Sequence, residues 1–537
     1  MFTDKEVKIQ ISKQFRGEIA MNKIIRIDRN AEKEATNFSW QMGLGNDHAY
    51  MIHRTDVCSH IKLAHDELGI KYIRCHGILD DDMLTFQKMS DYRAFKSVPG
   101  AKKIEEINFR QVGHVYDNLL DCGVRPFVEL SFMPTALASG KKLGLRYDPN
   151  ITMPKSMDSW TKYIQAFIRF LINRYGSEEV EQWYFEVWNE PDLSCFFAGT
   201  KEDYFHLYEA TAKAVKQVNP NLRVGGPSTS ACLWLDDFVS FIEKNNVPCD
   251  FISTHHYPGD AFGNFINMGN VKHMMKASRN AVKEHRSLSE TMRDMFFLPE
   301  DFKKWDKGTL AKLDDDAKGK IGDRKLFITE WNSMAVFGSP VHDEKYSAAF
   351  LVKSVMDLNG AADAYMFWCC SDLFEEQFML PKPFVGSFGI VSNDGIPKPN
   401  FWGFKILSQL FPKRLKTPFR TNDAVEYAAF VDGDRTQVLL YTQNQDYFCD
   451  DRFEIDVEVN NVANKVSSCC IDDTHCNPKA EWMKLGLPDN LTSEQAMEIR
   501  KKTSLKEEAV EFKVTDSETK VKVSMGTNEV VLLTFEA

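Results

Sequence analysis

The sequence predicts an α/β protein, a (β/α)8 TIM barrel with a C-terminal β-sandwich and a small helical insertion. Eight apolar runs alternate with amphipathic stretches, which is the pattern of such a barrel. After about Pro399 the pattern changes to short strands separated by turn residues, as in an antiparallel sandwich. A chain of 537 residues is also too long for one compact core. We therefore predict an N-terminal strand that joins the sandwich, then the barrel, then the sandwich itself, over residues 1–15, 16–372 and 373–537.

The predicted barrel strands are apolar runs rich in aromatic and β-branched residues, which is typical of strands covered on both faces. They are the runs 38–43, 71–77, 125–132, 182–188, 222–226, 251–257, 326–331 and 364–368. The spacing of apolar residues between them predicts helices. These cover residues 59–68, 109–122, 157–175, 201–218, 233–245 and 345–359, with Gly360 as the last C-cap.

The segment from Gly259 to Arg324, between the sixth and seventh strands, is longer than one helix and its loops require. Its part from Pro299 to Asp323 is rich in lysine and aspartate, so we predict a solvated surface insertion. A cover over the barrel mouth and a subunit contact are the alternatives.

The sandwich is predicted from short strands at residues 426–430, 438–441, 453–459 and 530–535. Residues 7–11 alternate between apolar and polar side chains and are assigned as an edge strand. A helical insertion is predicted near residues 485–504, because Thr492 to Gln495 forms a helix-start pattern.

Composition excludes several classes of partner. The net charge of −11 and pI near 5.7 argue against nucleic acid or an anionic membrane surface. The sequence contains no run of about 18 apolar residues, the length that a membrane-spanning helix needs. Its first residues lack the apolar core of a secretory signal. Twelve cysteines with adjacent pairs predict free thiols and a cytoplasmic location. Cysteine and histidine residues also cluster at Cys469, Cys470, His475 and Cys476. Their spacing is not one that zinc sites use, so we predict no metal site there.

Two strand ends carry matching glutamates. The run from Trp183 to Pro191 ends in Asn189-Glu190, and the run 325–332 places Glu330 at the same point. The carboxyl ends of barrel strands meet at one mouth, so the two carboxyl groups are expected to face each other. A carboxyl pair of this kind carries out glycoside hydrolysis, whereas a single strand-end glutamate is more often only solvated. Indole rings beside Glu190 also favour a raised pKa, which a general acid needs.

Other predicted strand ends carry groups suited to a sugar. Arg74 and His76 share one face of their strand by alternation, and so do His255 and Tyr257, while His256 points elsewhere. Any one of these histidines taken alone is more often structural. Aromatic residues supply apolar walls for sugar rings, although they serve equally well in a core: Trp188, Trp331, Trp368, Phe132 and Phe374. After the last strand, Glu375 or Glu376 supplies a further carboxylate, with a solvated acidic loop as the alternative.

Together these motifs resemble glycoside hydrolase family 39, the family of β-xylosidases and α-L-iduronidases, and fit its β-xylosidase branch better. The similarity covers nearly the whole chain and includes residues 71–77 with Asp81-Asp82-Met83, 126–134, 188–191, 253–257, 329–332, 371–376 and 396–399. Cys75, where an aromatic residue is expected, departs from the pattern but should face away from the mouth.

The resemblance implies a retaining hydrolase with Glu190 as acid/base and Glu330 as nucleophile. It also implies that Asn189 binds the 2-hydroxyl group of the sugar, that His76 binds another hydroxyl, and that Tyr257 contacts the nucleophile. No metal or organic cofactor is required. Relatives suggest a homo-oligomer. The expected activity is release of xylose from xylo-oligosaccharides. A β-glucoside, β-galactoside, arabinoside or α-L-iduronide as substrate, and a carbohydrate-binding protein without catalysis, are the alternatives. No cationic group is assigned that would meet the carboxylate of an iduronide.

Overall fold

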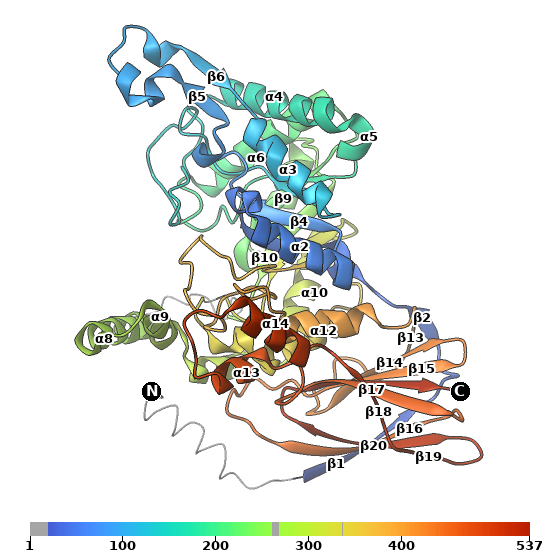
Figure 1. Ribbon diagram of the computed structural model, residues 1–537. Helices are drawn as coiled ribbons and strands as arrows, with labels where there is room; N and C mark the ends of the chain where they lie inside the picture. The colour runs from blue at the N-terminus through green and yellow to red at the C-terminus, as the bar shows by residue number, and fades with distance from the viewer. Residues whose placement is uncertain (1–19, 260–267, 336) are drawn as a thin grey trace.

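The computed structural model describes residues 20–259, 268–335 and 337–537. Eight parallel strands form a closed barrel, which lies above a β-sandwich in Figure 1. In sequence order the barrel strands are β3 (Gly43–His48), β4 (Tyr72–His76), β7 (Arg125–Glu129), β8 (Tyr184–Glu186), β9 (Arg223–Thr229), β10 (Phe251–His256), β11 (Leu326–Trp331) and β12 (Ala364–Phe367). The predicted (β/α)8 barrel is therefore confirmed.

The first predicted strand, 38–43, is wrong. Ser39–Met42 forms a 3-10 turn, and the strand β3 begins at Gly43. This strand is rich in glycine because its neighbours leave no room for side chains. A Cβ atom at Gly43 would lie 2.6 Å from the Met366 methyl carbon, and one at Gly45 would lie 2.2 Å from the Trp368 ring. An apolar pattern cannot identify a strand of this kind.

Helices cover the outside of the barrel. They are α2 (Thr55–Leu68), α3 (Arg110–Asp121), α4 (Met157–Tyr175), α6 (Lys201–Val218), α7 (Leu235–Lys244), α10 (Thr309–Ile321), α11 (Lys345–Leu358) and α12 (Pro399–Ser408), with a short α5 (Ser177–Val180) after α4. The bounds of α4 and α6 agree with the prediction. Helix α11 ends at Asn359 in the left-handed region, followed by Gly360 with φ 87°. Because α12 packs against α11 and α2, the barrel continues beyond the predicted boundary at 372.

The segment between the sixth and seventh strands contains α8 (Met268–Glu284), α9 (Leu288–Phe296) and the barrel helix α10. Figure 1 shows α8 and α9 projecting from the side of the molecule. Helix α9 contributes Met292 to an apolar cluster that also contains Trp368 and Phe374. The prediction of a solvated insertion is wrong for α10, which packs against β10 and β11 and buries Asp314 and Ile321 completely.

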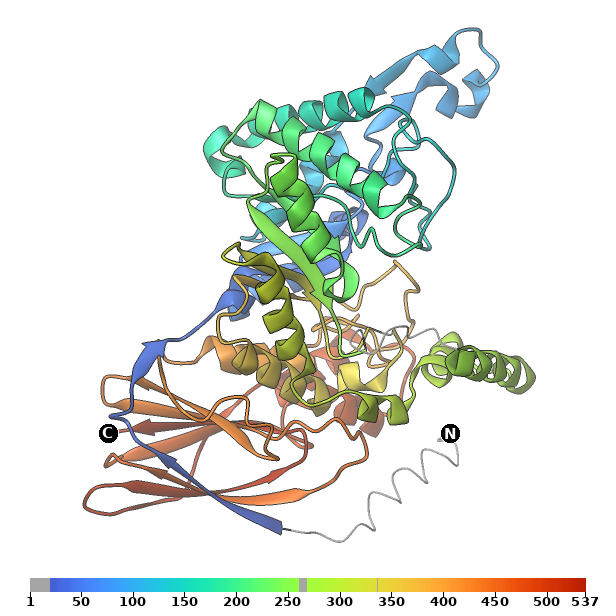
Figure 2. The same ribbon diagram turned by 180° about the vertical axis from the view of Figure 1, so that it is seen from behind.

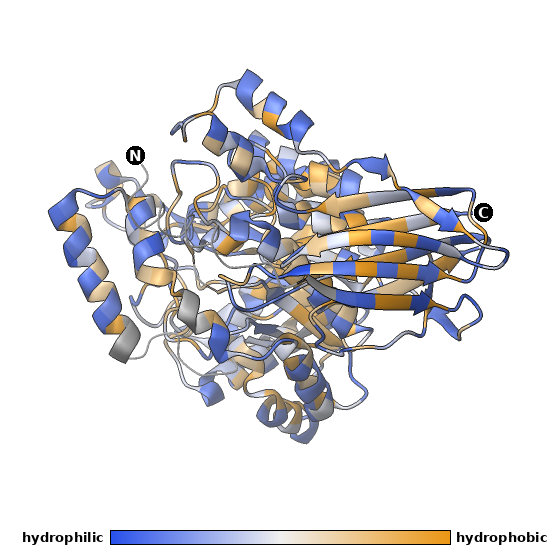
Figure 3. Cartoon of the chain, turned by 90° about the horizontal axis from the view of Figure 1, so that it is seen from below, coloured by the Kyte–Doolittle hydropathy of each residue, from blue (hydrophilic) through white to orange (hydrophobic). Residues whose placement is uncertain are grey.

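The sandwich consists of two sheets around a separate apolar core. One sheet contains β1 (Ala20–Ile27), β16 (Arg452–Val459), β20 (Thr519–Gly526) and β19 (Phe512–Val514). The other contains β18 (Glu507–Ala509), β17 (Lys465–Ile471), β21 (Val530–Glu536), β15 (Arg435–Tyr441), β14 (Glu426–Asp432), β13 (Lys413–Leu415) and β2 (Lys33–Ala35). Apolar and polar residues alternate along these strands, as Figure 3 shows.

The N-terminal part of the chain contributes edge strands to both sheets. Strand β1 pairs in parallel with β16, and β2 pairs with β13. Figure 2 shows β1 in blue as a strand of the sandwich, to which it contributes an edge. The predicted edge strand at residues 7–11 lies outside the described residues. Because residues 20–35 pair with sandwich strands, the predicted barrel boundary at residue 16 is too early.

Smaller elements complete the chain. A hairpin of β5 (Phe86–Lys88) and β6 (Glu105–Ile107) extends from the barrel between β4 and β7. The helical insertion in the sandwich contains α13 (Pro478–Lys484) and α14 (Ser493–Lys502), so it begins earlier than the predicted 485. The predicted helix start is confirmed, because Thr492 and Gln495 form a capping box. Within the described part of the chain, we find no helix whose length and hydropathy would let it cross a bilayer.

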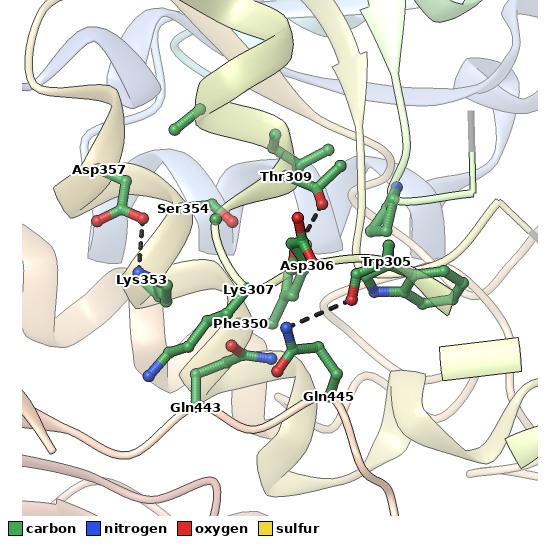
Figure 4. Close-up of a pocket in the computed structure, with 14 residues that line it drawn as sticks. Trp305, Asp306, Lys307, Thr309, Phe350, Lys353, Ser354, Asp357, Gln443 and Gln445 are labelled. Atoms are coloured by element: carbon green, nitrogen blue, oxygen red, sulfur yellow. Dashed lines mark hydrogen bonds and ion pairs between the residues drawn. The ribbon is translucent and has the colours of Figure 1, made fainter. Parts of the chain in front are cut away.

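Buried charges join the barrel to the sandwich, as Figure 4 shows in part. The Lys353 ammonium lies 2.7 Å from an Asp357 oxygen and 3.0 Å from a Glu426 oxygen. Lys307 lies 2.8 Å from the other oxygen of Glu426. Glu426 belongs to β14 of the sandwich, so these pairs fix its orientation relative to α11 of the barrel.

Candidate active site

Arg74 lies at the centre of the barrel mouth and is completely buried. Its Nε donates to Glu186 at 2.7 Å, and its Nη2 lies 2.8 Å from oxygens of both Glu129 and Asn189. Its Nη1 is 3.5 Å from Oε2 of Glu330. A buried guanidinium needs such compensation, because an unpaired charge away from water is costly. The Arg74 guanidinium, on β4, therefore contacts residues at the ends of three other strands, β7, β8 and β11.

Glu330, on β11, receives contacts from the end of β10. The Tyr257 hydroxyl donates to Oε1 at 2.5 Å, and Nδ1 of His255 lies 3.5 Å from Oε2. The register between these strands shifts here, since Thr254 pairs with Ile328 whereas His255 pairs with Glu330. Such a bulge redirects side chains at the end of a strand. Burial raises the pKa of Glu330, although His255 and Arg74 act in the opposite direction.

Glu190 follows the short strand β8 in a turn with unusual backbone angles. Trp188 has φ 74° and Glu190 has φ 39°, and the Glu190 amide donates to the Ser228 carbonyl at 2.8 Å. The carboxyl group lies 3.0 Å from Nδ1 of His255. Burial and the nearby Asp192 raise the pKa of Glu190 to about 8. At neutral pH this carboxyl group therefore holds a proton.

The two carboxyl groups meet across a short gap. One oxygen of Glu190, one oxygen of Glu330 and one nitrogen of His255 all lie within 4.8 Å of one another. Burial lowers the pKa of His255 to about 4, so the ring is neutral between the two acids. These three atoms are spaced closely enough to bind a metal ion. The contacts of His255 with Glu190 and with Glu330 are sufficient to explain this spacing without a metal ion. Both glutamates are 7% exposed, so a substrate can reach groups that are largely shielded from water.

His76 and its neighbours form the adjoining wall. Nδ1 of His76 lies 2.8 Å from Glu129, and Nε2 lies 3.4 Å from Glu376. Burial alone would lower the pKa of His76, but Glu129 and Glu376 outweigh it and raise the pKa to about 9. The Trp368 ring lies 4.7 Å from the imidazole, and the Phe132 ring lies 6.4 Å from it. The cluster thus combines a cation, carboxyl groups and aromatic faces, as sugar sites do.

Two polar atoms at the mouth have no hydrogen-bond partner among the residues that the structure describes. They are Nδ2 of Asn189 and Oε2 of Glu376. Buried polar groups of this kind are rare unless a ligand or water satisfies them. Burial raises the pKa of Glu376 to about 8, so this group also carries a proton at neutral pH. Both atoms are therefore suited to bind the hydroxyl groups of a substrate.

One predicted site residue, Trp331, lies away from the mouth. It alternates with Glu330 and points toward the helices, where it stacks on Tyr365 at 4.2 Å and is fully buried. The carboxylate of Glu375 lies 3.6 Å from the partly exposed Arg146, whereas that of Glu376 lies against His76. The Asp47 carboxylate accepts from the backbone amides of residues 375 and 376 and fixes this turn.

Three further residues considered in the sequence lie behind the mouth. Trp188 and Phe374 support the wall from behind, through edge contacts with Phe132 and Trp368 respectively. Cys75 belongs to the core between barrel and helices, so it faces away from the mouth as expected.

Sequence reasoning missed three groups that complete the site, Glu129, Glu186 and Ser228, and left open whether Glu375 or Glu376 belongs to it. Glu129 and Glu186 both end apolar strands. These two glutamates could have been predicted. An arginine in a buried barrel strand, Arg74, requires buried carboxylates as partners. Ser228, whose hydroxyl lies 3.2 Å from both Arg74 and His255, follows a cis-proline turn and gave no such signal.

A closed (β/α)8 barrel with paired, buried carboxyl groups at the carboxyl ends of its strands defines a glycoside hydrolase. The family model for glycosyl hydrolases family 39 matches residues 23–519. The chain therefore belongs to this family.

Named relatives agree with this assignment. A β-xylosidase of Caldicellulosiruptor saccharolyticus is 36% identical over 523 residues, covering 96% of this chain and 99% of the relative. A β-xylosidase of Geobacillus stearothermophilus is 29% identical, covering 96% and 95% respectively. Among solved structures, the GH39 enzyme of Xanthomonas axonopodis pv. citri superposes with a TM-score of 0.76 at 27% identity and covers 96% of this chain and 98% of its own.

Proposed function

We propose that this glycosidase is a retaining β-xylosidase that releases xylose from the non-reducing ends of xylo-oligosaccharides. The observation that carries the mechanism is the short gap between Glu190 and Glu330, whose nearest acidic oxygens lie within 4.8 Å. Retaining enzymes hold their carboxyl groups about 5 Å apart, whereas inverting enzymes leave room for a water molecule between them. The choice of sugar is supported by the β-xylosidases among its relatives.

In the first step, an oxygen of Glu330 attacks the anomeric carbon while the glycosidic bond breaks. Glu190 donates its proton to the departing oxygen, which leaves as a neutral alcohol. The Tyr257 hydroxyl at Oε1 and the Arg74 guanidinium at Oε2 stabilise the carboxylate form of Glu330. The product of this step is a covalent ester between the sugar and Glu330.

In the second step, Glu190 acts as a base. Formation of the ester removes the negative charge of Glu330, and this loss lowers the pKa of Glu190. Glu190 then accepts a proton from an incoming water molecule, whose oxygen attacks the anomeric carbon and releases Glu330. Two inversions give net retention. The neutral ring of His255, 3.0 Å from Glu190, maintains the carboxyl orientation during both steps.

The wall around the carboxyl groups supplies recognition of the sugar. Asn189 offers an unpaired amide donor next to the acid/base, in position for the 2-hydroxyl group. His76 and Glu376 offer a donor and a carboxyl group on the opposite side, and Trp368 offers a flat apolar face. The substrate is a neutral sugar on this proposal, because the cations Arg74 and His76 already have carboxylate partners.

The proposed location is a reducing compartment such as the cytoplasm. All twelve cysteines are free thiols in the structure, including the neighbouring Cys369 and Cys370. Xylo-oligosaccharides from xylan degradation would then reach the enzyme after import.

The test is the initial rate of hydrolysis of a panel of nitrophenyl glycosides: β-xyloside, β-glucoside, β-galactoside, α-arabinosides and α-L-iduronide. We expect the highest kcat/KM for the β-xyloside, and Glu330→Gln serves as the inactive control. A higher value for another glycoside would contradict the choice of sugar. Proton NMR of the first-formed product would show β-xylose, whereas α-xylose would contradict retention.

A further inference from the structure

His256 lies between two residues that contact Glu330, yet it faces the opposite side of the sheet. It is completely buried on β10. Nε2 of its ring lies 3.2 Å from the Tyr365 hydroxyl, and Nδ1 lies 3.3 Å from an oxygen of Asp314. The proposed mechanism uses none of these three residues. Their side chains connect β10 to β12 and to helix α10.

Asp314 is an unusual residue for its position. It is fully buried on α10, in the layer between the barrel and its helices. Among the residues that the structure describes, the imidazole of His256 is the group within ion-pairing distance of this carboxyl. A buried carboxyl group with so few partners is costly and has to be offset by the contact it makes. Burial raises the pKa of Asp314 and lowers the pKa of His256, so burial disfavours the charged form of each group.

Tyr365 connects this pair to the strand of Glu330. Its ring stacks on Trp331 with a centroid distance of 4.2 Å and an angle of 22° between planes. Trp331 directly follows Glu330 and is held on its other side by the edge of Phe367. The three side chains Asp314, His256 and Tyr365 therefore lead from α10 to the residue beside the candidate nucleophile.

The register of the sheet explains why the ends of β10 and β11 need this support. The bulge between Thr254 and His255 leaves Thr329 unpaired in the ladder between these two strands. The Thr329 hydroxyl donates instead to Glu186, 2.8 Å away. Beyond the bulge, His255 pairs with Glu330 and His256 pairs with Trp331. A ladder interrupted in this way needs side-chain contacts to fix its position.

We propose that Asp314, His256 and Tyr365 form a positioning network that holds the end of β10 against β11, so that Tyr257 and His255 keep their contacts with Glu330. None of the three is assigned contact with the substrate. The inference rests on the proposed function only in that Glu330 acts as the nucleophile. It does not depend on which sugar is cleaved.

The experiment compares three variants of the full chain on the glycoside that the wild-type enzyme hydrolyses best. Tyr365→Phe removes one hydroxyl and keeps the ring stack, and Asp314→Asn keeps the shape of the side chain. Asp357→Asn is the matched control, because Asp357 is also a buried carboxyl on a barrel helix but faces the sandwich. Each variant is measured for Tm and for kcat/KM as a function of pH.

We expect kcat/KM of Tyr365→Phe to fall about 10-fold, because small displacements of reacting groups are costly in rate. The fall in Asp314→Asn should be smaller, since the amide keeps the shape of the carboxyl group, which lies 3.3 Å from the His256 ring. The acid limb of the pH profile should move to higher pH in both, because a weaker bond from Tyr257 raises the pKa of Glu330. The control should change Tm without moving the profile.

Unchanged kcat/KM and an unchanged acid limb in Tyr365→Phe would overturn the proposal, whatever the change in Tm. If Asp314→Asn does not fold, Tyr365→Phe decides the outcome alone. A wild-type enzyme that prefers another sugar would contradict the proposed substrate but leave this comparison intact. The two failures are therefore distinguishable.

Discussion

Two of the buried charge clusters in the described part of the chain differ in composition, one at the barrel mouth and one at the junction of barrel and sandwich. At the junction, two lysines meet two carboxylates, and every pair is 3.0 Å or closer: Lys353 with Asp357, Lys353 with Glu426, and Lys307 with Glu426. At the mouth, the cations Arg74 and His76 lie among a larger number of carboxyl groups, those of Glu129, Glu186, Glu190, Glu330 and Glu376. The junction is balanced in charge and the mouth is not.

This difference in balance has a chemical consequence. At the mouth the carboxyl groups outnumber the cations, so some of them retain protons. The pKa values of Glu190 and Glu376 rise to about 8 through burial, whereas Glu129 remains ionised because Arg74 and His76 hold its pKa below the ordinary value despite burial. A site that must both donate and accept protons requires such an excess. The junction needs only to hold two domains together.

The largest effect is expected from removing Glu330, the proposed nucleophile. Glu330→Gln should lower kcat for the preferred nitrophenyl glycoside by roughly 10⁴-fold or more, since loss of a covalent nucleophile leaves little catalysis. Tm should change little. The measurement is steady-state kinetics with Tm as the control for folding. Residual kcat within a factor of ten of wild type would show that Glu330 is not the nucleophile.

Removing the acid/base should have a smaller effect that depends on the leaving group. Glu190→Gln should lower kcat/KM by about 10²–10⁴-fold for a poor leaving group such as an alkyl glycoside, and much less for a dinitrophenyl glycoside.

The pH profile of the wild-type enzyme gives a second test. Activity requires protonated Glu190, whose pKa is about 8. Wild-type kcat/KM should therefore decline above about pH 8, and this basic limb should be absent in the variant. A basic limb that persists in Glu190→Gln would assign it to another group.

The junction should respond in stability and not in rate. Lys353→Met leaves Asp357 and Glu426 buried with one cation instead of two, and should destabilise the protein by about 3–5 kcal/mol. The free energy of unfolding in urea is the measurement, with kcat/KM below the transition as its companion. The exposed pair Lys312–Asp306 gives the matched control, since Lys312→Met should cost less than about 1 kcal/mol. A large fall in kcat/KM of folded Lys353→Met would break the distinction between the two clusters.

The smallest effect is expected in KM, when each of the adjacent residues Glu375 and Glu376 is replaced by glutamine. Glu376→Gln should raise KM about 10-fold, because it changes a buried group that faces the substrate side of His76. Glu375→Gln should change KM less than about 2-fold, since the side chain of Glu375 is directed to Arg146 on the surface. Competitive inhibition by xylose offers an independent measure of the same difference. Equal effects of the two variants would place the carboxyl of Glu376 outside the site.

The sequence predicted those features that backbone geometry determines. The carboxyl ends of parallel barrel strands lie at one mouth, so the proximity of Glu190 and Glu330 could be predicted from two matching strand ends. Alternation also placed Arg74, His76, His255 and Tyr257 correctly within their strands. The same rule predicts that Trp331 points away from Glu330, and its assignment to the site overlooked this.

Features that depend on tertiary packing were not predictable in the same way. Strand β3 lacks an apolar pattern because Trp368 and Met366 occupy the space that its side chains would fill. The direction of Glu376 depends on Asp47, which is distant in the sequence. The sequence of helix α10 contains the spacing of a packed helix, but its many lysines and aspartates led to the prediction of a solvated insertion. Its buried residues Leu310, Asp314, Ala317 and Ile321 recur at helical spacing.

The central claim is that Glu330 is the nucleophile and Glu190 the acid/base in a site with an excess of carboxyl groups. Its most direct test is the product that Glu330→Gly forms from an activated β-glycoside in the presence of azide. Azide should occupy the space left by the carboxylate, restore part of the turnover and give an α-glycosyl azide. Glu190→Gly should give the β-glycosyl azide under the same conditions. A β-configured azide from Glu330→Gly would contradict the account and exchange the two roles.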